Sequence, residues 1–137
     1  MVQKKIAQTE TEWKDLLEAD VFHILREKGT EPPFSGTLLH NTEKGVYACA
    51  GCGNPLFSSE TKFDSGSGWP SFWDVVSKDS VVLLPDKSHS IQRIEVQCSR
   101  CDGHLGHVFD DGPKPTNKRY CINSLSLNFS KKSEGNS

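Results

Sequence analysis

The sequence predicts a mainly β domain of antiparallel strands that follows an N-terminal helix. Helical periodicity is confined to the start of the chain, and short alternating runs separated by glycine, proline and serine follow it. Two C-x-x-C pairs each come directly after such a run, as in hairpins joined by a metal site. A chain of 137 residues has room for one core, so we expect one domain over 9–129, a flexible N-terminus at 1–8 and a disordered tail at 130–137.

The helix is expected over residues 9–29, TETEWKDLLEADVFHILREKG. Thr9 and Glu12 have the spacing of a capping box, and Gly29 ends the pattern just before the proline-containing stretch TEPPFSG. The apolar residues at near-helical spacing are Trp13, Leu16, Leu17, Val21 and Leu25. We expect this apolar face to pack on the rest of the domain.

Five later runs alternate between apolar and polar residues and are predicted to be strands. They are GVYAC, SVVLL, IQRIEVQC, GHVF and RYCINSLSLNF. The last run, residues 119–129, is expected to be one continuous strand. Its alternation places on one face Arg119, Cys121, Asn123, Leu125, Leu127 and Phe129. Because polar groups and a core stripe share that face, the polar end is expected at the rim of a pocket.

Composition argues against several classes of protein. With 16 basic and 18 acidic residues the net charge is -2, which gives no basic surface for nucleic acid. The longest apolar stretch, around VVLLP, is far shorter than the roughly 20 residues of a membrane helix. An odd number of cysteines without a secretory signal indicates a reducing compartment. We expect a cytoplasmic monomer that binds neither nucleic acid nor membranes; an organelle-targeting segment that has been removed would leave the same pattern.

Four of the five cysteines form two pairs, Cys49 with Cys52 and Cys98 with Cys101. A glycine closely follows each pair, so backbone amides can turn toward the sulfurs, as a zinc knuckle requires. We expect the pairs to form one closed structural zinc site. An iron-sulfur cluster or a redox-active pair is the alternative. A further alternative is a Cys2His2 site, because the next candidate ligands at the same spacing after Cys98 and Cys101 are His104 and His107.

Cys121 is the cysteine left over from the two pairs. Arg119 shares its strand face and would stabilise a thiolate there, although a free cysteine is also an ordinary, inert core residue. The stretch HLGHVFDDG brings His104 and His107, and Gly106 between them can form a bulge that turns both toward one side. Two histidines beside a spare thiol favour proton transfer over a purely structural role.

The loop FDSGSGWPSFW adds aromatic side chains after a run of small residues. Trp69 follows flexible glycines and precedes a proline, a setting that suits the wall of a pocket. Phe72 and Trp73 are expected in the core.

These motifs together resemble one family, the type B methionine sulfoxide reductases, which reduce the R epimer of methionine sulfoxide. The matching stretches are GTEPPFSG, the two cysteine pairs, FDSGSGWPSF, HLGHVFDDGP and RYCINS. The resemblance implies a β-tent of two antiparallel sheets with N-terminal helical segments, clamped by a structural zinc ion away from the active site. It also implies that the partners are oxidised proteins bearing methionine-R-sulfoxide and a thiol reductant.

The resemblance further implies a role for each site residue. Cys121 would attack the sulfoxide sulfur and become a sulfenic acid as methionine leaves, while His104 and His107 would protonate the departing oxygen. Trp69 would pack on the substrate's methyl group, and Phe109 would also contact the substrate. The remaining groups of the catalytic site would be Arg119, Asn123 and Asp111.

One position departs from the pattern of many family members. Ser67 stands where they carry a cysteine that attacks the sulfenic acid and forms a disulfide for thioredoxin. We therefore expect Cys121 to act alone, with its sulfenic acid reduced directly by thioredoxin or a glutathione-based system. Two other functions are a zinc-clamped binding module without chemistry and a C-x-x-C disulfide oxidoreductase. A binding module has no need for Cys121, His104, His107 and Arg119 as a set.

Overall fold

The computed structural model describes residues 10–86 and 93–131 of the chain. The expected flexible N-terminus and residues 132–137 of the expected tail lie outside the described residues, as does Thr9 of the predicted capping box. Ser130 and Lys131, also assigned to the tail, continue the last strand.

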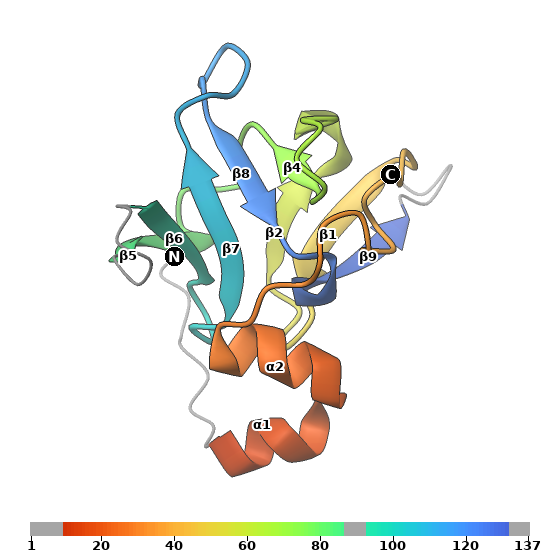
Figure 1. Cartoon of the computed structure of the whole chain (residues 1–137), viewed down its shortest axis with the longest axis vertical. Helices are drawn as coiled ribbons and strands as arrows, with labels where there is room; N and C mark the ends of the chain where they lie inside the picture. Colours follow the sequence, from red (N-terminus) through yellow and green to blue (C-terminus); the bar gives the residue numbers. More distant parts are fainter. Residues whose placement is uncertain (1–9, 87–92, 132–137) are drawn as a thin grey trace.

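The N-terminal segment forms two helices, α1 (Glu10–Leu16) and α2 (Ala19–Glu27), where the sequence predicted one. The break lies at Leu17 and Glu18, because Glu18 has extended backbone angles (φ -64, ψ 154) and precedes α2 as its N-cap residue. A chain that turns here brings two separate helix faces to the sheets. Both helices lie on one side of the strands (Figure 1).

This break changes which apolar side chains are buried. Trp13 of α1 and Leu25 of α2 are each 2% exposed, but Leu16 is 66% exposed, contrary to the prediction, and Ile24 is buried instead. The predicted stop at Gly29 is also displaced. Helix α2 ends at Glu27, and Lys28 takes the left-handed conformation (φ 58) that glycine more often adopts.

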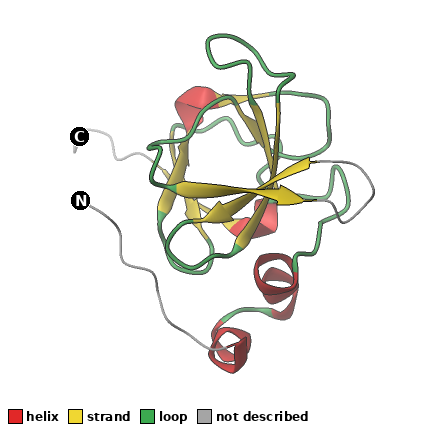
Figure 2. Ribbon diagram, turned by 90° about the vertical axis from the view of Figure 1, so that its left-hand side faces the viewer, coloured by secondary structure: helices red, strands yellow, loops and turns green. Residues whose placement is uncertain are grey.

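The strands form two antiparallel sheets, which confirms the predicted fold class (Figure 2). The three-stranded sheet has the order β2-β1-β9, with strands Pro55–Ser58, Gly45–Cys49 and Leu127–Lys131. The six-stranded sheet has the order β3-β4-β8-β7-β6-β5, with strands Lys62–Phe63, Ser71–Phe72, Arg119–Ile122, His104–Phe109, Arg93–Cys98 and Val81–Asp86. Strands β2, β3 and β4 are too short to show alternation and were not predicted.

The segment 119–129 is not the single strand that the sequence predicted. Strand β8 ends at Ile122, a 3-10 turn covers Ser124–Ser126, and β9 begins at Leu127 in the other sheet. Asn123 turns the chain, because its side chain donates to the carbonyl of Leu105 (3.0 Å) and accepts from the backbone N–H of Glu31 (3.0 Å). This corner joins the two sheets just beyond Cys121 (Figure 1).

The core lies between the sheets and is centred on aromatic rings. Phe57 and Phe72 stack with their centroids 4.4 Å apart, and Tyr47 meets Phe72 edge-on at 5.1 Å. All three are fully buried, so each phenylalanine ring contributes about 1.5 to 3 kcal/mol through the area it removes from water. The predicted core position of Phe72 is confirmed, and the packed rings give β4 and β8 a rigid support.

Candidate active site

A cavity of about 270 Å³ opens beside strands β7 and β8. It is lined by Thr30, Ser67, Trp69, Arg93, Gly106, His107, Phe109, Arg119, Cys121 and Asn123. Six of the residues predicted for catalysis or substrate contact therefore share one cavity. His104 and Asp111 are not on its wall.

Cys121 lies in the middle of the sheet, with β4 on one side and β7 on the other. Its Cα is paired with Ser71 of β4 and with His107 of β7. Burial raises the pKa of the Cys121 thiol, while the Ser67 hydroxyl and the Arg119 guanidinium act in the opposite direction. The Sγ atom lies 3.8 Å from Ser67 Oγ. Cys121 is thus half-buried at a cavity wall, not enclosed as an inert core residue.

Arg119 is held in place by two contacts on β7 and its following loop. Its Nε and Nη2 atoms donate to the two oxygens of Asp111 at 2.8 and 3.2 Å, and its guanidinium lies 4.4 Å above the ring of Phe109. The ion pair lowers the pKa of Asp111 and raises that of Arg119. Asp111 itself is largely exposed, so it acts on the cavity through the orientation of Arg119.

The two histidines of β7 turn toward the same side, as predicted. The pairing between β6 and β7 shifts next to Leu105, where an extra residue forms the bulge. The ring centroids of His104 and His107 are 5.5 Å apart. Gly106 has a second function, because a Cβ there would lie 2.0 Å from the carbonyl oxygen of Cys121. Only glycine permits this close approach of β7 to the strand that carries the thiol.

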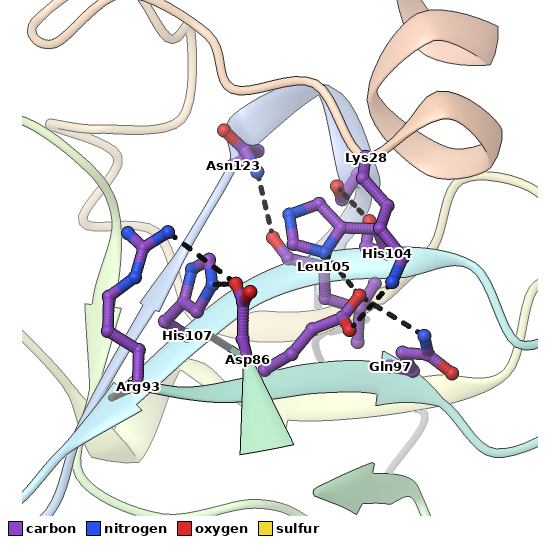
Figure 3. A network of polar contacts seen from close by, with 10 residues as sticks. Lys28, Asp86, Arg93, Gln97, His104, Leu105, His107 and Asn123 are labelled. Carbon is purple, nitrogen blue, oxygen red and sulfur yellow. Dashed lines mark hydrogen bonds and ion pairs between the residues drawn. The ribbon is translucent and has the colours of Figure 1, made fainter. Parts of the chain in front are cut away.

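Each histidine is paired with a carboxylate from another strand of the same sheet, His104 with one from β6 and His107 with one from β5 (Figure 3). His107 Nε2 lies 2.7 Å from Asp86 Oδ2, and Arg93 reaches the same oxygen at 3.5 Å. His104 Nδ1 lies 2.7 Å from Glu95 Oε2. A carboxylate fixes the orientation of an imidazole, as required of a group that passes protons.

His104 and Glu95 are both 3% exposed and form a buried pair behind the cavity wall. Burial lowers the pKa of His104, partly offset by Glu95. Burial pushes the pKa of Glu95 up, but hydrogen bonds from His104 and Gln97 outweigh it and the pKa falls. Lys28 supplies a further positive charge, 3.3 Å from Glu95. Of the two histidines only His107 faces the cavity.

The indole of Trp69 is fixed by the stretch that follows α2. Its Nε1 donates to the backbone carbonyl of Glu31 (3.0 Å), and the backbone N–H of Glu31 donates to the Asn123 side chain. Gly68 has a φ of +97, and a Cβ there would lie 2.7 Å from Pro33. The motif GTEPPFSG therefore holds Trp69 in place, and Glu31 of this motif connects the Trp69 ring to the corner at Asn123.

Sequence reasoning missed the residues that support these side chains. Glu31, Asp86 and Glu95 each contact a predicted site residue, and Arg93 contacts Asp86. A signal existed for Glu95, because it is an acid between two aliphatic residues of a predicted strand. Asp86 and Arg93 gave no signal, since the strand register alone brings Arg93 to Asp86 and Asp86 to His107.

The four paired cysteines gather in one cluster. Their sulfurs all lie within 4.8 Å of one another, with Cys49 to Cys101 at 3.6 Å and Cys52 to Cys98 at 3.5 Å. A tetrahedron of sulfurs around zinc has edges of about 3.8 Å, so this donor set can hold such an ion. The amide of Gly51 points at one sulfur, as in metal-binding turns. The Cys2His2 alternative is wrong, because the histidines pair with carboxylates.

The cysteine cluster is distant from the cavity. Cys98 ends β6, whereas Arg93 of the cavity begins it, and five residues of strand span about 17 Å. The cluster joins the end of β1 in one sheet to the end of β6 in the other. It is therefore placed to clamp the two sheets, not to meet a ligand in the cavity.

Comparisons with known proteins agree over nearly the whole chain. The SelR domain family matches residues 17–131, which include the cavity residues and the cysteine cluster. A peptide methionine sulfoxide reductase MsrB of Methanosarcina barkeri is 62% identical over 135 residues, covering 98% of this chain and 95% of that protein. The protein of the same name from Methanosarcina mazei is 60% identical over 134 residues, covering 98% and 96%. Across the described part of the chain, no helix is long and apolar enough to span a membrane.

Proposed function

The chain belongs to the SelR domain family, which includes the MsrB methionine sulfoxide reductases, and we propose that it reduces methionine-R-sulfoxide through a sulfenic acid at Cys121. One observation carries the proposal. The Cys121 thiol lines a cavity together with a carboxylate-paired histidine and two aromatic side chains. A sulfoxide has a matching asymmetry, with a polar oxygen and an apolar methyl group.

The first step transfers the sulfoxide oxygen to the protein. Cys121 Sγ, as the thiolate, attacks the sulfoxide sulfur and forms a transient bond between the two sulfurs while the sulfoxide oxygen takes up a proton. The oxygen then passes from the methionine sulfur to Cys121 Sγ as the bond between the sulfurs breaks and methionine leaves. The oxygen and a proton remain on Cys121 as a sulfenic acid. Methionine sulfur is reduced by two electrons and the cysteine sulfur is oxidised by two, so the step balances without a redox cofactor. Arg119, on the same strand face, stabilises the thiolate.

Protonation of the oxygen is assigned to the histidines of β7. His107 faces the cavity, and Asp86 at 2.7 Å holds its ring. His104 lies behind it with Glu95 and completes the pair of rings. We assign direct proton donation to His107 and a supporting role to His104, which refines the equal roles that the sequence suggested.

The aromatic side of the cavity is assigned to the substrate's methyl group. Trp69 and Phe109 both line the cavity; the Trp69 indole is fixed by its hydrogen bond to Glu31, and the Phe109 ring is covered by the Arg119 guanidinium. We expect only one epimer to place its sulfur at Cys121 while its oxygen meets His107 and its methyl group meets an aromatic ring. Asn123 lines the cavity and holds the corner, and Asp111 positions Arg119.

Regeneration is assigned to an external thiol. All five cysteines are described, and the four other than Cys121 are gathered in the distant cluster. Ser67 occupies the position 3.8 Å from Cys121 Sγ where a second thiol would be able to attack. An external thiol attacks the sulfenic acid and releases water, and a second thiolate then frees Cys121 as the thiol. Thioredoxin or a glutathione-based system would supply these thiols to a cytoplasmic, monomeric enzyme acting on oxidised proteins.

Zinc is proposed as the ion of the cysteine cluster. Cys49, Cys52, Cys98 and Cys101 would hold it, and a site closed by four thiolates leaves no open position for a substrate. Its contribution is structural, because it links the ends of β1 and β6.

The test compares epimers and variants. The zinc-loaded protein is given the R or the S epimer of a methionine sulfoxide peptide with dithiothreitol, beside Cys121→Ser as a matched control. We expect turnover of the R epimer by the parent protein alone. Equal turnover by Cys121→Ser, or equal turnover of both epimers, would contradict the proposal.

A further inference from the structure

Three serine hydroxyls form a line that begins at the Cys121 thiol. Ser67 Oγ lies 3.8 Å from Cys121 Sγ and 2.8 Å from Ser65 Oγ, which in turn lies 2.6 Å from Ser71 Oγ. The Ser71 hydroxyl then donates to the carbonyl oxygen of Trp69 at 3.1 Å. Ser71 is 1% exposed. The line thus runs from the thiol to the backbone of the residue whose ring lines the cavity.

The direction of these hydrogen bonds is set at the carbonyl end. A carbonyl only accepts, so the proton of Ser71 points to Trp69 and Ser71 must accept from Ser65. Ser65 then accepts from Ser67, and Ser67 accepts from the thiol. The line has four contacts, and three hydroxyls plus one thiol supply four protons. Every contact is satisfied while Cys121 is protonated.

Loss of the thiol proton leaves three protons for the same four contacts. Ser67 then turns to donate to the thiolate, Ser65 donates to Ser67, and Ser71 donates to Ser65. The contact left without a proton is the one between Ser71 and the Trp69 carbonyl. The two contacts between serines keep their protons, because two oxygens 2.6 or 2.8 Å apart without a proton between them repel each other. Ionisation therefore gains a charge-assisted bond at sulfur and loses one neutral bond at the far end.

We propose that Ser67, Ser65 and Ser71 form a hydroxyl relay that couples the protonation of Cys121 to the Trp69 carbonyl. Ser65 and Ser71 are positioning residues that hold the proton on the resting thiol. The inference rests on the proposed function in that Cys121 is the nucleophile. A thiol that keeps its proton at rest resists adventitious oxidation, which matters in a site with serine at the resolving position.

Charged groups also act on Cys121 from the elements packed around it. Arg119 lies on the same strand, His107 is its partner on β7, and Glu31 and Arg93 complete the surroundings. Burial raises the pKa of Cys121, Arg119 opposes this rise and Glu31 adds to it. These groups act on the sulfur directly, whereas in the relay the outer serines reach it by way of Ser67. That difference can be measured.

The test follows the rate of alkylation of Cys121 by iodoacetamide against pH in the zinc-loaded protein. Mass spectrometry of the peptide that contains Cys121 reports this site alone, and no sulfoxide turnover is needed. Ser67→Ala should raise the pKa of Cys121. Ser65→Ala and Ser71→Ala should each lower it by about half to one pH unit, the equivalent of one neutral hydrogen bond. Ser65→Thr keeps a hydroxyl and should retain the parent value.

The decisive comparison repeats Ser71→Ala in a Ser67→Ala background. A relay that is cut at Ser67 predicts no further change in the pKa of Cys121. An equal shift in both backgrounds, or no shift from either outer serine, would overturn the relay. If Ser71→Ala does not fold, Ser65→Ala replaces it in the same comparison, because Ser65 is partly exposed and its substitution disturbs the core less. A protein that shows these shifts but reduces no sulfoxide would refute the proposed function and leave the relay standing.

Discussion

Replacing Gly106 with alanine would push apart the two strands that carry the active-site side chains. The added Cβ would lie 2.0 Å from the carbonyl oxygen of Cys121 and 3.0 Å from its carbonyl carbon. Both are backbone atoms, so no side-chain rotation relieves the overlap. Because real Cβ contacts essentially never fall below 3.0 Å, β7 and β8 must separate by about 1 Å.

The cost of this separation can be worked out for both stability and rate. Overpacking of this kind costs about 1 to 3 kcal/mol, which lowers the Tm of a domain of this size by about 3 to 12 °C. The same shift moves Cys121 relative to His107, and a misplacement of 1 Å can reduce a rate by about 100-fold. Thermal unfolding and turnover of methionine-R-sulfoxide with dithiothreitol measure the two effects.

Gly51→Ala is the matched control. Its Cβ would meet the ends of the Leu25 and Trp13 side chains, each at 3.3 Å, so a shift of a few tenths of an ångström relieves the contact. We expect a change of less than about 1 kcal/mol and a normal rate. If Gly106→Ala has the Tm and the turnover rate of the parent protein, the inference that β7 and β8 approach too closely for a Cβ is wrong.

Three further predictions concern the thiols and the buried histidine. Ser67→Cys places a second sulfur beside Cys121, so peptide mapping after one turnover should find a disulfide between residues 67 and 121; a persistent sulfenic acid would count against this geometry. Chelation of zinc should lower the Tm by many degrees and should not activate the protein, whereas a C-x-x-C oxidoreductase would gain activity. Because burial keeps the pKa of His104 low, the unfolded chain binds a proton that the folded chain does not, so the urea midpoint should fall as pH drops below about 6.5. His104→Asn should flatten this dependence, and an unchanged slope would speak against it.

Local patterns predicted the fold class and the cysteine cluster from the sequence. The alternation of apolar and polar residues predicted antiparallel strands. Each C-x-x-C turn brings two sulfurs together within four residues, so only the meeting of the two turns depends on the fold. The bulge near Gly106 was predictable for the same reason. The separation into two sheets came from family resemblance, because periodicity does not specify which strands pair.

Tertiary contacts decided the features that periodicity placed wrongly. The corner at Asn123 depends on Leu105 and Glu31, which are distant in sequence, and an alternating pattern continues through it unchanged. The break at Glu18 lets Trp13 and Leu25 both reach the core, although a single helix satisfies the same spacing.

The residues that contact and orient the site side chains were the least predictable part of the site. Glu95 and Asp86 meet the histidines because β5, β6 and β7 pair in one particular register, and the bulge shifts that register by a residue. A sequence identifies the imidazoles as candidates, but it does not identify the carboxylates that orient them. For the same reason His104 was expected beside the substrate, whereas it lies buried behind the cavity.

The proposal that Cys121 works without a second cysteine is tested most directly by a single turnover in the absence of any reductant. The zinc-loaded protein is mixed with excess methionine-R-sulfoxide peptide, quenched with a sulfenic-acid trap and mapped by mass spectrometry. We predict one methionine per chain and the trapped adduct on Cys121 alone, with the four cluster cysteines unchanged. A disulfide between Cys121 and any other cysteine of the chain, or methionine formed by Cys121→Ser, would contradict it.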